Sequence, residues 1–268
     1  MSRECPVGVF DSGIGGLTVA REIMRQMPDE QIIYFGDTAR LPYGSKSRET
    51  VIRYSRQIVK FLLSYGVKAI VVACNTASAY ALETIKQELS IPVVGVVKPG
   101  AVTAARTTKN GRIGVIGTEG TINSNIYTRY LQDINPDIKV YGKACPLFVP
   151  LVEEGMLYDS VTVEMADRYT SELKGYGVDT LVLGCTHYPL IRHTIQKAMG
   201  EAVTLVNPAY ETAQELHRIL VEQNLCRDQR NPEHKFFVSD GAEKFKAFAN
   251  TILPCEVEET NDVNIEQY

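Results

Sequence analysis

Uninterrupted apolar runs alternate with longer stretches of helical spacing in the N-terminal part of the chain. The runs lie at residues 7–10, 32–35, 69–73 and 93–97, and the helical stretches include residues 17–27, 51–65 and 78–89. Strands that alternate with helices of this length form βαβ units, in which helices cover both faces of a parallel sheet. Such strands are buried on both faces and are therefore apolar throughout. The sequence predicts an α/β fold built on parallel sheets.

One part of this pattern is repeated about 110 residues later. Residues 66–74 have the sequence GVKAIVVAC and residues 177–185 have GVDTLVLGC, with four of nine positions identical. Residues 7–10 have a similar counterpart at 113–116. The period is too long for a solenoid repeat, so it predicts two similar α/β domains.

Two proline-containing junctions mark the expected domain boundaries, at Lys98-Pro99-Gly100 and Asn207-Pro208. Residues 98–206 would form the second domain. Residues 207–268 contain an expected helix at 211–223 and a strand at 236–238, too little for a third core. We therefore expect them to join residues 1–97 in a discontinuous first domain.

Composition and charge exclude several classes of partner. The chain has 28 basic and 32 acidic side chains and a net charge of −4, so it lacks the basic surplus of a dedicated nucleic-acid binder. Its longest apolar runs are about six residues, whereas a membrane span needs about 20. The N-terminus lacks the apolar stretch of a signal peptide. We expect a cytoplasmic protein that binds neither nucleic acid nor membranes and keeps its six cysteines as free thiols.

Two of these cysteines, Cys74 and Cys185, stand at the ends of the repeated strands. The carboxyl ends of parallel strands form the ligand crevice of such sheets. A helix is expected to follow each cysteine, and a helix N-terminus would lower the pKa of a thiol there. A free cysteine is most often a small buried hydrophobe. Two cysteines at matched strand ends instead favour a catalytic pair, and the other four cysteines lack this setting.

A glycine-rich turn, DSGIGG at residues 11–16, follows the first strand. It is similar to a dinucleotide-binding fingerprint, but Thr18 stands where the last glycine belongs, and Asp11 would turn a carboxylate towards a pyrophosphate. The chain also lacks a Gly-Lys-Ser/Thr phosphate loop. The turn could simply begin a helix. In the functional alternative, Asp11 takes part in catalysis and Ser12 contacts the substrate.

His187 and two polar loops complete the candidate site. An imidazole two residues after Cys185 could stabilise a thiolate or carry a proton, although a lone histidine is more often a partly buried polar residue. The sequence shows no further ligands for a metal at this place. Residues 42–44 and 153–154 could be only a turn and a solvated helix end. Their places in the two repeats suggest that both loops reach one cleft.

Together these motifs resemble the glutamate racemases of the aspartate/glutamate racemase family. The resemblance runs from about residue 7 to 199 and becomes thin beyond residue 211. Leu41 is a small departure, because many members have cysteine or another residue there. The matching segments are FDSGIGG (10–16), PYG (42–44), ACNTA (73–77), GVIGT (114–118), FVPLVE (148–153) and GCTHYP (184–189).

The resemblance implies two pseudo-symmetric parallel-sheet α/β domains with the active site in the cleft between them. It implies an isomerase that interconverts L- and D-glutamate without cofactor or metal and supplies D-glutamate for peptidoglycan, and so for cell-wall biogenesis and cell shape. Family members are often dimers, which allows a homodimer here. The family's catalytic cysteines fall on Cys74 and Cys185, acting as two bases on opposite faces of the α-carbon, and its helper groups fall on Asp11, Glu153 and His187. Its substrate contacts fall on Asp11, Ser12, Pro42, Tyr43, Gly44, Asn75, Thr76, Thr118, Thr121, Thr186 and His187.

Three other functions stay open from the residues alone. A racemase of aspartate or another amino acid would use the same chemistry. A binding protein could use the two-domain cleft only to hold an acidic ligand. A thiol hydrolase would need a carboxylate that orients His187, and the sequence does not reveal one.

Overall fold

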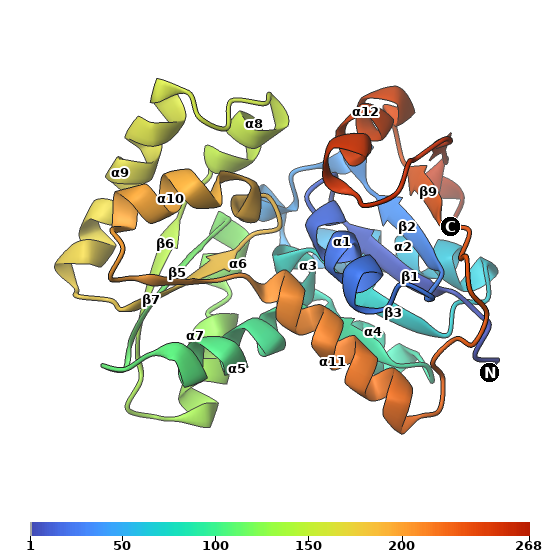
Figure 1. Ribbon diagram of the computed structural model, residues 1–268, viewed down its shortest axis with the longest axis horizontal. Helices are drawn as coiled ribbons and strands as arrows, with labels where there is room; N and C mark the ends of the chain where they lie inside the picture. Colours follow the sequence, from blue (N-terminus) through green and yellow to red (C-terminus); the bar gives the residue numbers. More distant parts are fainter. Residues whose placement is uncertain (1) are drawn as a thin grey trace.

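The strands form two parallel β-sheets in a computed structural model that describes residues 2–268 (Figure 1). In their order across the first sheet, the strands are β10 (Asn261–Asp262), β9 (Lys235–Val238), β2 (Ile32–Gly36), β1 (Val7–Asp11), β3 (Ala69–Val72) and β4 (Val93–Gly95). The second sheet consists of β6 (Lys139–Ala144), β5 (Arg112–Gly117), β7 (Thr180–Gly184) and β8 (Thr204–Val206). Every pairing in both sheets is parallel, which confirms the predicted α/β fold.

The internal repeat corresponds to a repeated strand order. The order β2-β1-β3-β4 in the first sheet recurs as β6-β5-β7-β8 in the second. The two cysteine-bearing segments therefore end equivalent strands, β3 and β7, each beside the central strand of its half. The predicted boundaries at 97/98 and 206/207 remain a prediction, with the second falling between β8 and the helix that follows it.

Helices cover both faces of each sheet. On the first sheet, α1 (Leu17–Gln26), α11 (Pro208–Glu222) and α12 (Ala242–Ile252) pack on one face, and α2 (Arg48–Ser64), α3 (Asn75–Tyr80) and α4 (Leu82–Glu88) on the other. On the second sheet, α5 (Val97–Thr107) and α7 (Ile126–Ile134) oppose α8 (Phe148–Glu153), α9 (Ser160–Gly175) and α10 (Arg192–Met199) (Figure 1). The remaining short segments are α6 (Glu119–Asn123), η1 (Thr38–Arg40), η2 (Tyr43–Ser45), η3 (Tyr188–Ile191) and η4 (Ile265–Gln267).

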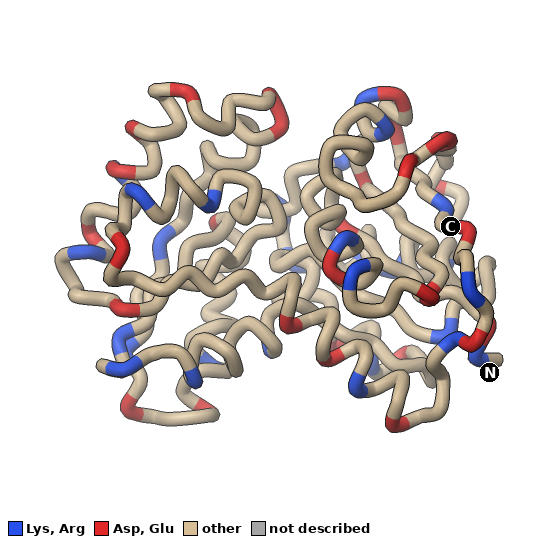
Figure 2. The backbone as a smooth tube through the Cα atoms, viewed as in Figure 1, with Lys and Arg blue, Asp and Glu red and all other residues tan. Residues whose placement is uncertain are grey.

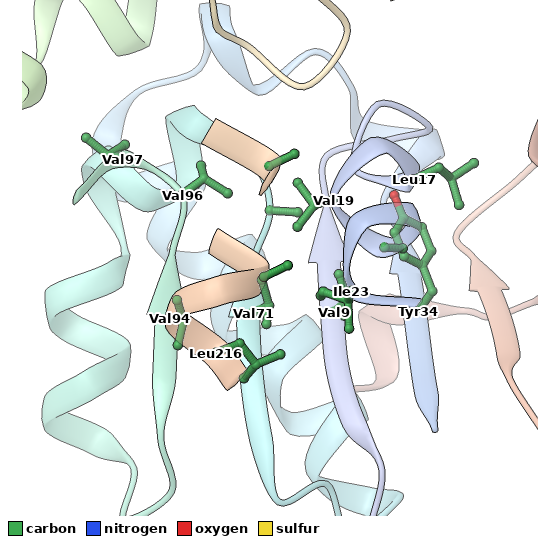
Figure 3. Packing of buried hydrophobic residues seen from close by; sticks show 14 of the residues in the cluster. Val9, Leu17, Val19, Ile23, Tyr34, Val71, Val94, Val96, Val97 and Leu216 are labelled. Atoms are coloured by element: carbon green, nitrogen blue, oxygen red, sulfur yellow. The ribbon is translucent and has the colours of Figure 1, made fainter. Parts of the chain in front are cut away.

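One apolar core continues from the first sheet into the second. Val9 and Val71 of the first sheet pack with Leu216 of α11, as Figure 3 shows. The same cluster includes Ala101 of α5 and Val182 of β7. Because α5 and α11 contribute to this shared core, the two sheets are held together by buried apolar surface as well as by chain connections.

The structure corrects three local expectations. The helix expected at 78–89 is broken at Ala81 into α3 and α4. The strand expected at 93–97 ends at Gly95, and Lys98-Pro99-Gly100 lies in the first turn of α5 rather than in a linker. A first turn tolerates proline because its N–H groups have no partner within the helix. Gly100 allows α5 to approach α11, since a Cβ at this position would lie 2.9 Å from Cγ of Pro208.

Charged residues lie mainly on the outer helices and loops, with both signs interspersed (Figure 2). Within residues 2–268, no helix combines the length and the apolar character needed to cross a membrane.

A buried ion pair is one exception to this surface placement of charge. Lys68 is fully buried, and its Nζ lies 2.6 Å from Oε2 of Glu30. The same Nζ donates to the carbonyl of Arg3 at 2.6 Å, and Glu30 accepts from the backbone N–H of Arg227 at 2.8 Å. These contacts join the N-terminal segment, the loop before β2 and the segment after α11.

We predict that Lys68→Met lowers the free energy of unfolding by about 3–5 kcal/mol, because it leaves the Glu30 carboxylate buried without its cation. The measurement is urea unfolding at neutral pH. Lys86→Met, which removes an exposed ion pair with Glu83, is the control and should change stability by less than about 1 kcal/mol. Adding Glu30→Gln to Lys68→Met should recover part of the loss, since the amide keeps an acceptor for Arg227 without the charge. Equal losses at the two lysines would contradict this account.

Candidate active site

A narrow cleft lies where the carboxyl ends of the two sheets meet. The space within it, including its open mouth, is about 360 Å³. Both sheets contribute to its walls, so the cleft depends on their packing against each other. Its lining residues are Ser12, Leu41, Pro42, Tyr43, Gly44, Cys74, Asn75, Thr76, Thr118, Val149, Glu153, Gly184, Cys185, Thr186 and His187.

The strand ends bring both predicted cysteines into this cleft. Cys74 follows β3 and is the N-terminal capping residue of α3, while Cys185 follows β7 and precedes η3. Each is only 6% exposed. The negative charge of a Cys185 thiolate would raise the pKa of Cys74, so the two sulfurs are electrostatically coupled.

Cys74 corrects the expectation that a helix N-terminus lowers the pKa of its thiol. Its Sγ accepts from the Ala77 N–H at 3.4 Å, and this contact does favour the thiolate. Burial and the nearby Asp11 carboxylate act in the opposite sense and raise the pKa of Cys74 to about 12. Removal from water therefore outweighs the helix end, and Cys74 is a neutral thiol at neutral pH.

Cys185 lies beside a histidine that a carboxylate orients. The Cys185 Sγ is 3.8 Å from Nδ1 of His187, and Nε2 of the same ring is 3.0 Å from Oε1 of Glu153. Burial lowers the pKa of His187, but the hydrogen bonds to Cys185 and Glu153 outweigh it and raise the pKa to about 10. His187 is thus an imidazolium at neutral pH, close enough to attract the charge of a thiolate.

The Glu153–His187 contact is the orienting interaction that sequence reasoning missed. The two residues are 34 positions apart, and Glu153 reaches the ring from the end of α8. Nothing in their sequence spacing indicates a pair. The family resemblance gave Glu153 and His187 as helper groups without pairing them, and the tertiary contact determines which nitrogen Glu153 meets.

Asp11 ends β1 and lies behind the cleft lining, where it is fully buried. Its carboxylate accepts from the Thr186 hydroxyl of the other sheet at 3.3 Å and from the Gly13 N–H at 3.0 Å. Burial raises the pKa of Asp11, and the charge of His187 opposes that rise. Gly15 permits the close approach of this turn, since a Cβ there would lie 2.4 Å from the Thr186 hydroxyl oxygen.

Hydroxyl and amide groups form the wall next to Cys74. The hydroxyl oxygen of Thr76 lies 2.8 Å from that of Thr118 and 3.3 Å from that of Thr121. Thr121 does not line the cleft and supports Thr118 from behind, at 3.1 Å. Asn75 accepts from the buried Tyr127 hydroxyl at 2.7 Å, which fixes the amide.

The remaining predicted residues also lie at the cleft. Ser12 is 3.7 Å from the Cys74 sulfur, and Pro42, Tyr43 and Gly44 form one side of the mouth. Leu41, Val149 and Gly184 also line the cleft, although none of them was predicted as a site residue. Over residues 2–268, no three His, Cys, Asp or Glu side chains gather as metal ligands.

Comparisons with known proteins agree with the fold and with the site motifs. The sequence profile of the family described as Asp/Glu/Hydantoin racemase matches residues 15–216. A glutamate racemase from Geobacter metallireducens is 52% identical over 261 residues, which cover 97% of each chain. The resemblance seen in the sequence motifs is thereby confirmed.

Solved structures give the same result. A glutamate racemase isoform from Bacillus anthracis superposes with a TM-score of 0.95 at 43% identity, covering 98% of each chain. A glutamate racemase from Francisella tularensis in complex with D-glutamate has a TM-score of 0.93 at 40% identity, covering 99% of this chain and 100% of the other. The match in sequence profile, full-length relatives and three-dimensional structure shows that this chain belongs to the Asp/Glu/Hydantoin racemase family.

Proposed function

We propose that this protein is a cofactor-independent glutamate racemase in which Cys74 and Cys185 act as two bases on opposite faces of the α-carbon. The observation that carries the proposal is their placement at equivalent strand ends of two repeated sheets, on one narrow cleft. Relatives named glutamate racemase, one of them solved with D-glutamate, support glutamate as the substrate.

Inversion at the α-carbon requires removal of a proton from one face and delivery of a proton to the other. A thiolate can do the first and a thiol the second without any rotation of the substrate. The raised pKa of Cys74 suits the donor state, and the imidazolium of His187 beside Cys185 suits the thiolate state. We therefore assign proton removal to Cys185 and delivery to Cys74 in one direction of the reaction. The reverse reaction exchanges the two roles.

The helper groups divide between the two cysteines. We assign His187, oriented by Glu153, to Cys185, and Asp11 to Cys74, because the charge of Asp11 raises the pKa of that thiol. Asp11 also connects the two sheets, because its buried carboxylate accepts a hydrogen bond from the hydroxyl of Thr186. Each cysteine would then have a titratable neighbour whose protonation can respond when the thiol gains or loses its proton.

The polar wall supplies the groups that would hold the two carboxylates of glutamate. The α-proton is weakly acidic, so hydrogen bonds must stabilise the developing negative charge. Expulsion of water from a narrow cleft strengthens such contacts. We assign this role to Ser12, Asn75, Thr76, Thr118 and Thr186, with Pro42, Tyr43 and Gly44 closing the mouth and Thr121 supporting Thr118.

The family resemblance extends the proposal to the role of the product. We propose that D-glutamate made here serves peptidoglycan synthesis, and hence cell-wall biogenesis and cell shape. A cytoplasmic location, a homodimer and independence from metals and cofactors stay predictions from the sequence.

A thiol hydrolase is the second candidate, because Glu153, His187 and Cys185 form a connected line of the kind such enzymes use. That function gives no role to Cys74.

The primary test is chiral analysis of L-glutamate incubated with the purified protein without added cofactor, with aspartate in parallel. Appearance of D-glutamate supports the proposal, and absence of any α-proton exchange would favour a binding protein.

We predict that Cys74→Ala and Cys185→Ala each lower kcat by at least about 10²–10⁴-fold, the usual contribution of a general acid or base. Cys226→Ala is the control, because that partly buried thiol lies outside the cleft and should leave turnover unchanged. The measurement is racemisation kinetics in both directions. A Cys74→Ala variant with near-normal turnover would remove Cys74 from the mechanism, and retained thiol-dependent hydrolysis would favour the second candidate.

We predict that D-glutamate formed early from L-glutamate in heavy water carries deuterium at the α-carbon, while unreacted L-glutamate stays largely protiated. The donor thiol exchanges with solvent before it delivers its proton, and the proton held by the other cysteine returns to its own face. Mass spectrometry of the separated enantiomers measures both pools. Early D-glutamate that retains its original hydrogen would rule out two separate bases.

We predict that Glu153→Gln shifts the alkaline limit of kcat/KM to lower pH. The hydrogen bonds to Cys185 and Glu153 overcome the effect of burial and raise the pKa of His187 to about 10, so the imidazolium is present below that pH and is lost above it. Loss of the carboxylate removes one of these raising contacts, while the amide can still accept from the ring. The pH profile of racemisation is the measurement, with Glu154→Gln as the control, since Glu154 is exposed and lies near Lys244. If the alkaline limit lies at the same pH in the unaltered protein, Glu153→Gln and Glu154→Gln, this role of Glu153 is contradicted.

A further inference from the structure

We propose that Asp37, Arg40 and the C-terminal Glu266 are positioning residues that hold the loop at the mouth of the cleft in place. This loop, residues 41–46, is called the cleft loop below. The inference rests on the proposed function, because it assigns these residues an effect on glutamate binding. None of the three lines the cleft itself.

The cleft loop bridges the two halves of the active site. It starts from η1 of the first half, and Gly44 packs directly against Thr118 of the second half. A Cβ at Gly44 would lie 2.5 Å from Cβ of Thr118. Because Leu41, Pro42, Tyr43 and Gly44 all line the cleft, the position of this loop sets the width of the mouth.

Asp37 connects the cleft loop to the ends of three strands. It follows β2 and is fully buried, and its backbone N–H donates to the carbonyl of Asp11 at 3.0 Å. Its carboxylate accepts from the hydroxyl of Tyr43 and, at 2.8 Å, from the hydroxyl of Ser239 beyond β9. Burial and the Asp37 charge raise the pKa of Tyr43, so this hydroxyl remains a donor.

Arg40 supplies the positive charge that a buried carboxylate requires. Its Nε donates to Oδ2 of Asp37 at 2.8 Å and to Oδ1 at 3.0 Å. The guanidinium lies over the ring of Tyr54, 4.0 Å from its centroid, and that ring packs against Tyr43 at 5.7 Å between centroids. The Nη1 group donates to Gln57 at 2.6 Å and to Glu266 at 2.9 Å.

The end of the chain fixes Glu266 at this place. Ile265 is buried against the helices of the first sheet, and the ring of Tyr268 meets Phe61 edge-on at 5.3 Å. Gln57 also donates to Glu266, at 3.3 Å. A continuous set of contacts therefore runs from Glu266 through Arg40 and Asp37 to the hydroxyl of Tyr43.

This arrangement explains why a terminal segment far from the reacting atoms would affect the site. Hydrogen bonds hold the guanidinium of Arg40 through its Nε and Nη1 groups, and its face packs on the ring of Tyr54. Loss of the Glu266 carboxylate removes one of the two Nη1 hydrogen bonds. Arg40 then becomes freer to move, and so do Asp37 and Tyr43, which it holds. Contacts that hold the substrate equally before and in the transition state affect KM rather than kcat.

The test uses the full-length chain with Glu266→Gln, Asp37→Asn and the control Glu259→Gln, an exposed glutamate of the same terminal segment. We expect Glu266→Gln to raise KM for glutamate by about 2–5-fold, as for a partly exposed ion pair, with little change in kcat. Asp37→Asn should raise KM by about 10–100-fold, because its charge-assisted hydrogen bonds are buried. Glu259→Gln should match the unaltered protein.

A double-mutant cycle separates positioning from general stability. In a Tyr43→Phe background the hydroxyl link to Asp37 is absent, so Glu266→Gln should add less to KM than it does alone. Additive effects, an unchanged KM in Glu266→Gln, or a fall in kcat at constant KM would overturn the proposal.

Amide hydrogen exchange tests the same inference without turnover. Exchange in a peptide covering residues 41–47 should be faster in Glu266→Gln than in Glu259→Gln, while peptides from β3 stay equal. Equal exchange of the cleft-loop peptide would overturn the proposal even if the protein racemises glutamate. Failure of the unaltered protein to racemise any amino acid would instead refute the proposed function and leave this readout valid.

Discussion

The cleft depends on how the carboxyl ends of two parallel sheets are held against each other. A hydrogen bond from Thr186 to the buried carboxylate of Asp11 crosses between the sheets. Thr18 of α1 donates to the carbonyl of the same Thr186 at 3.1 Å. The apolar core that α5 and α11 share holds the two sheets together. The polar contacts of Thr186 add to it at the carboxyl ends of the strands, where the cleft residues lie.

Removal from water gives the two sides of the cleft different electrostatic properties. On one side, burial and Asp11 keep Cys74 neutral by raising its pKa. On the other, hydrogen bonds keep His187 charged against the effect of burial. The two halves of the fold repeat the same strand order, but the charged and buried groups around Cys74 and Cys185 differ.

Two buried carboxylates at adjacent strand ends are stabilised in different ways. Asp11 has hydrogen bonds and the nearby His187, whereas Asp37 has the guanidinium of Arg40 as a direct partner. A backbone hydrogen bond from Asp37 to Asp11 joins the ends of β1 and β2.

Local patterns in the sequence predicted most of the strands, the parallel fold, the repeat and the matched cysteines, because apolar runs, glycine turns and strand-end residues are contiguous in the chain. Residues such as Ser12, Gly44 and Asn75 were also within reach, since their motifs are contiguous. The folded structure was needed to show that Glu153 meets His187, that Lys98-Pro99-Gly100 begins a helix, and that Glu266 accepts a hydrogen bond from Arg40. It also decided the protonation of Cys74, where burial outweighs the helix end. Contacts between residues that are distant in the chain, and the removal of groups from water, arise only when the chain folds, and a local sequence pattern does not contain them.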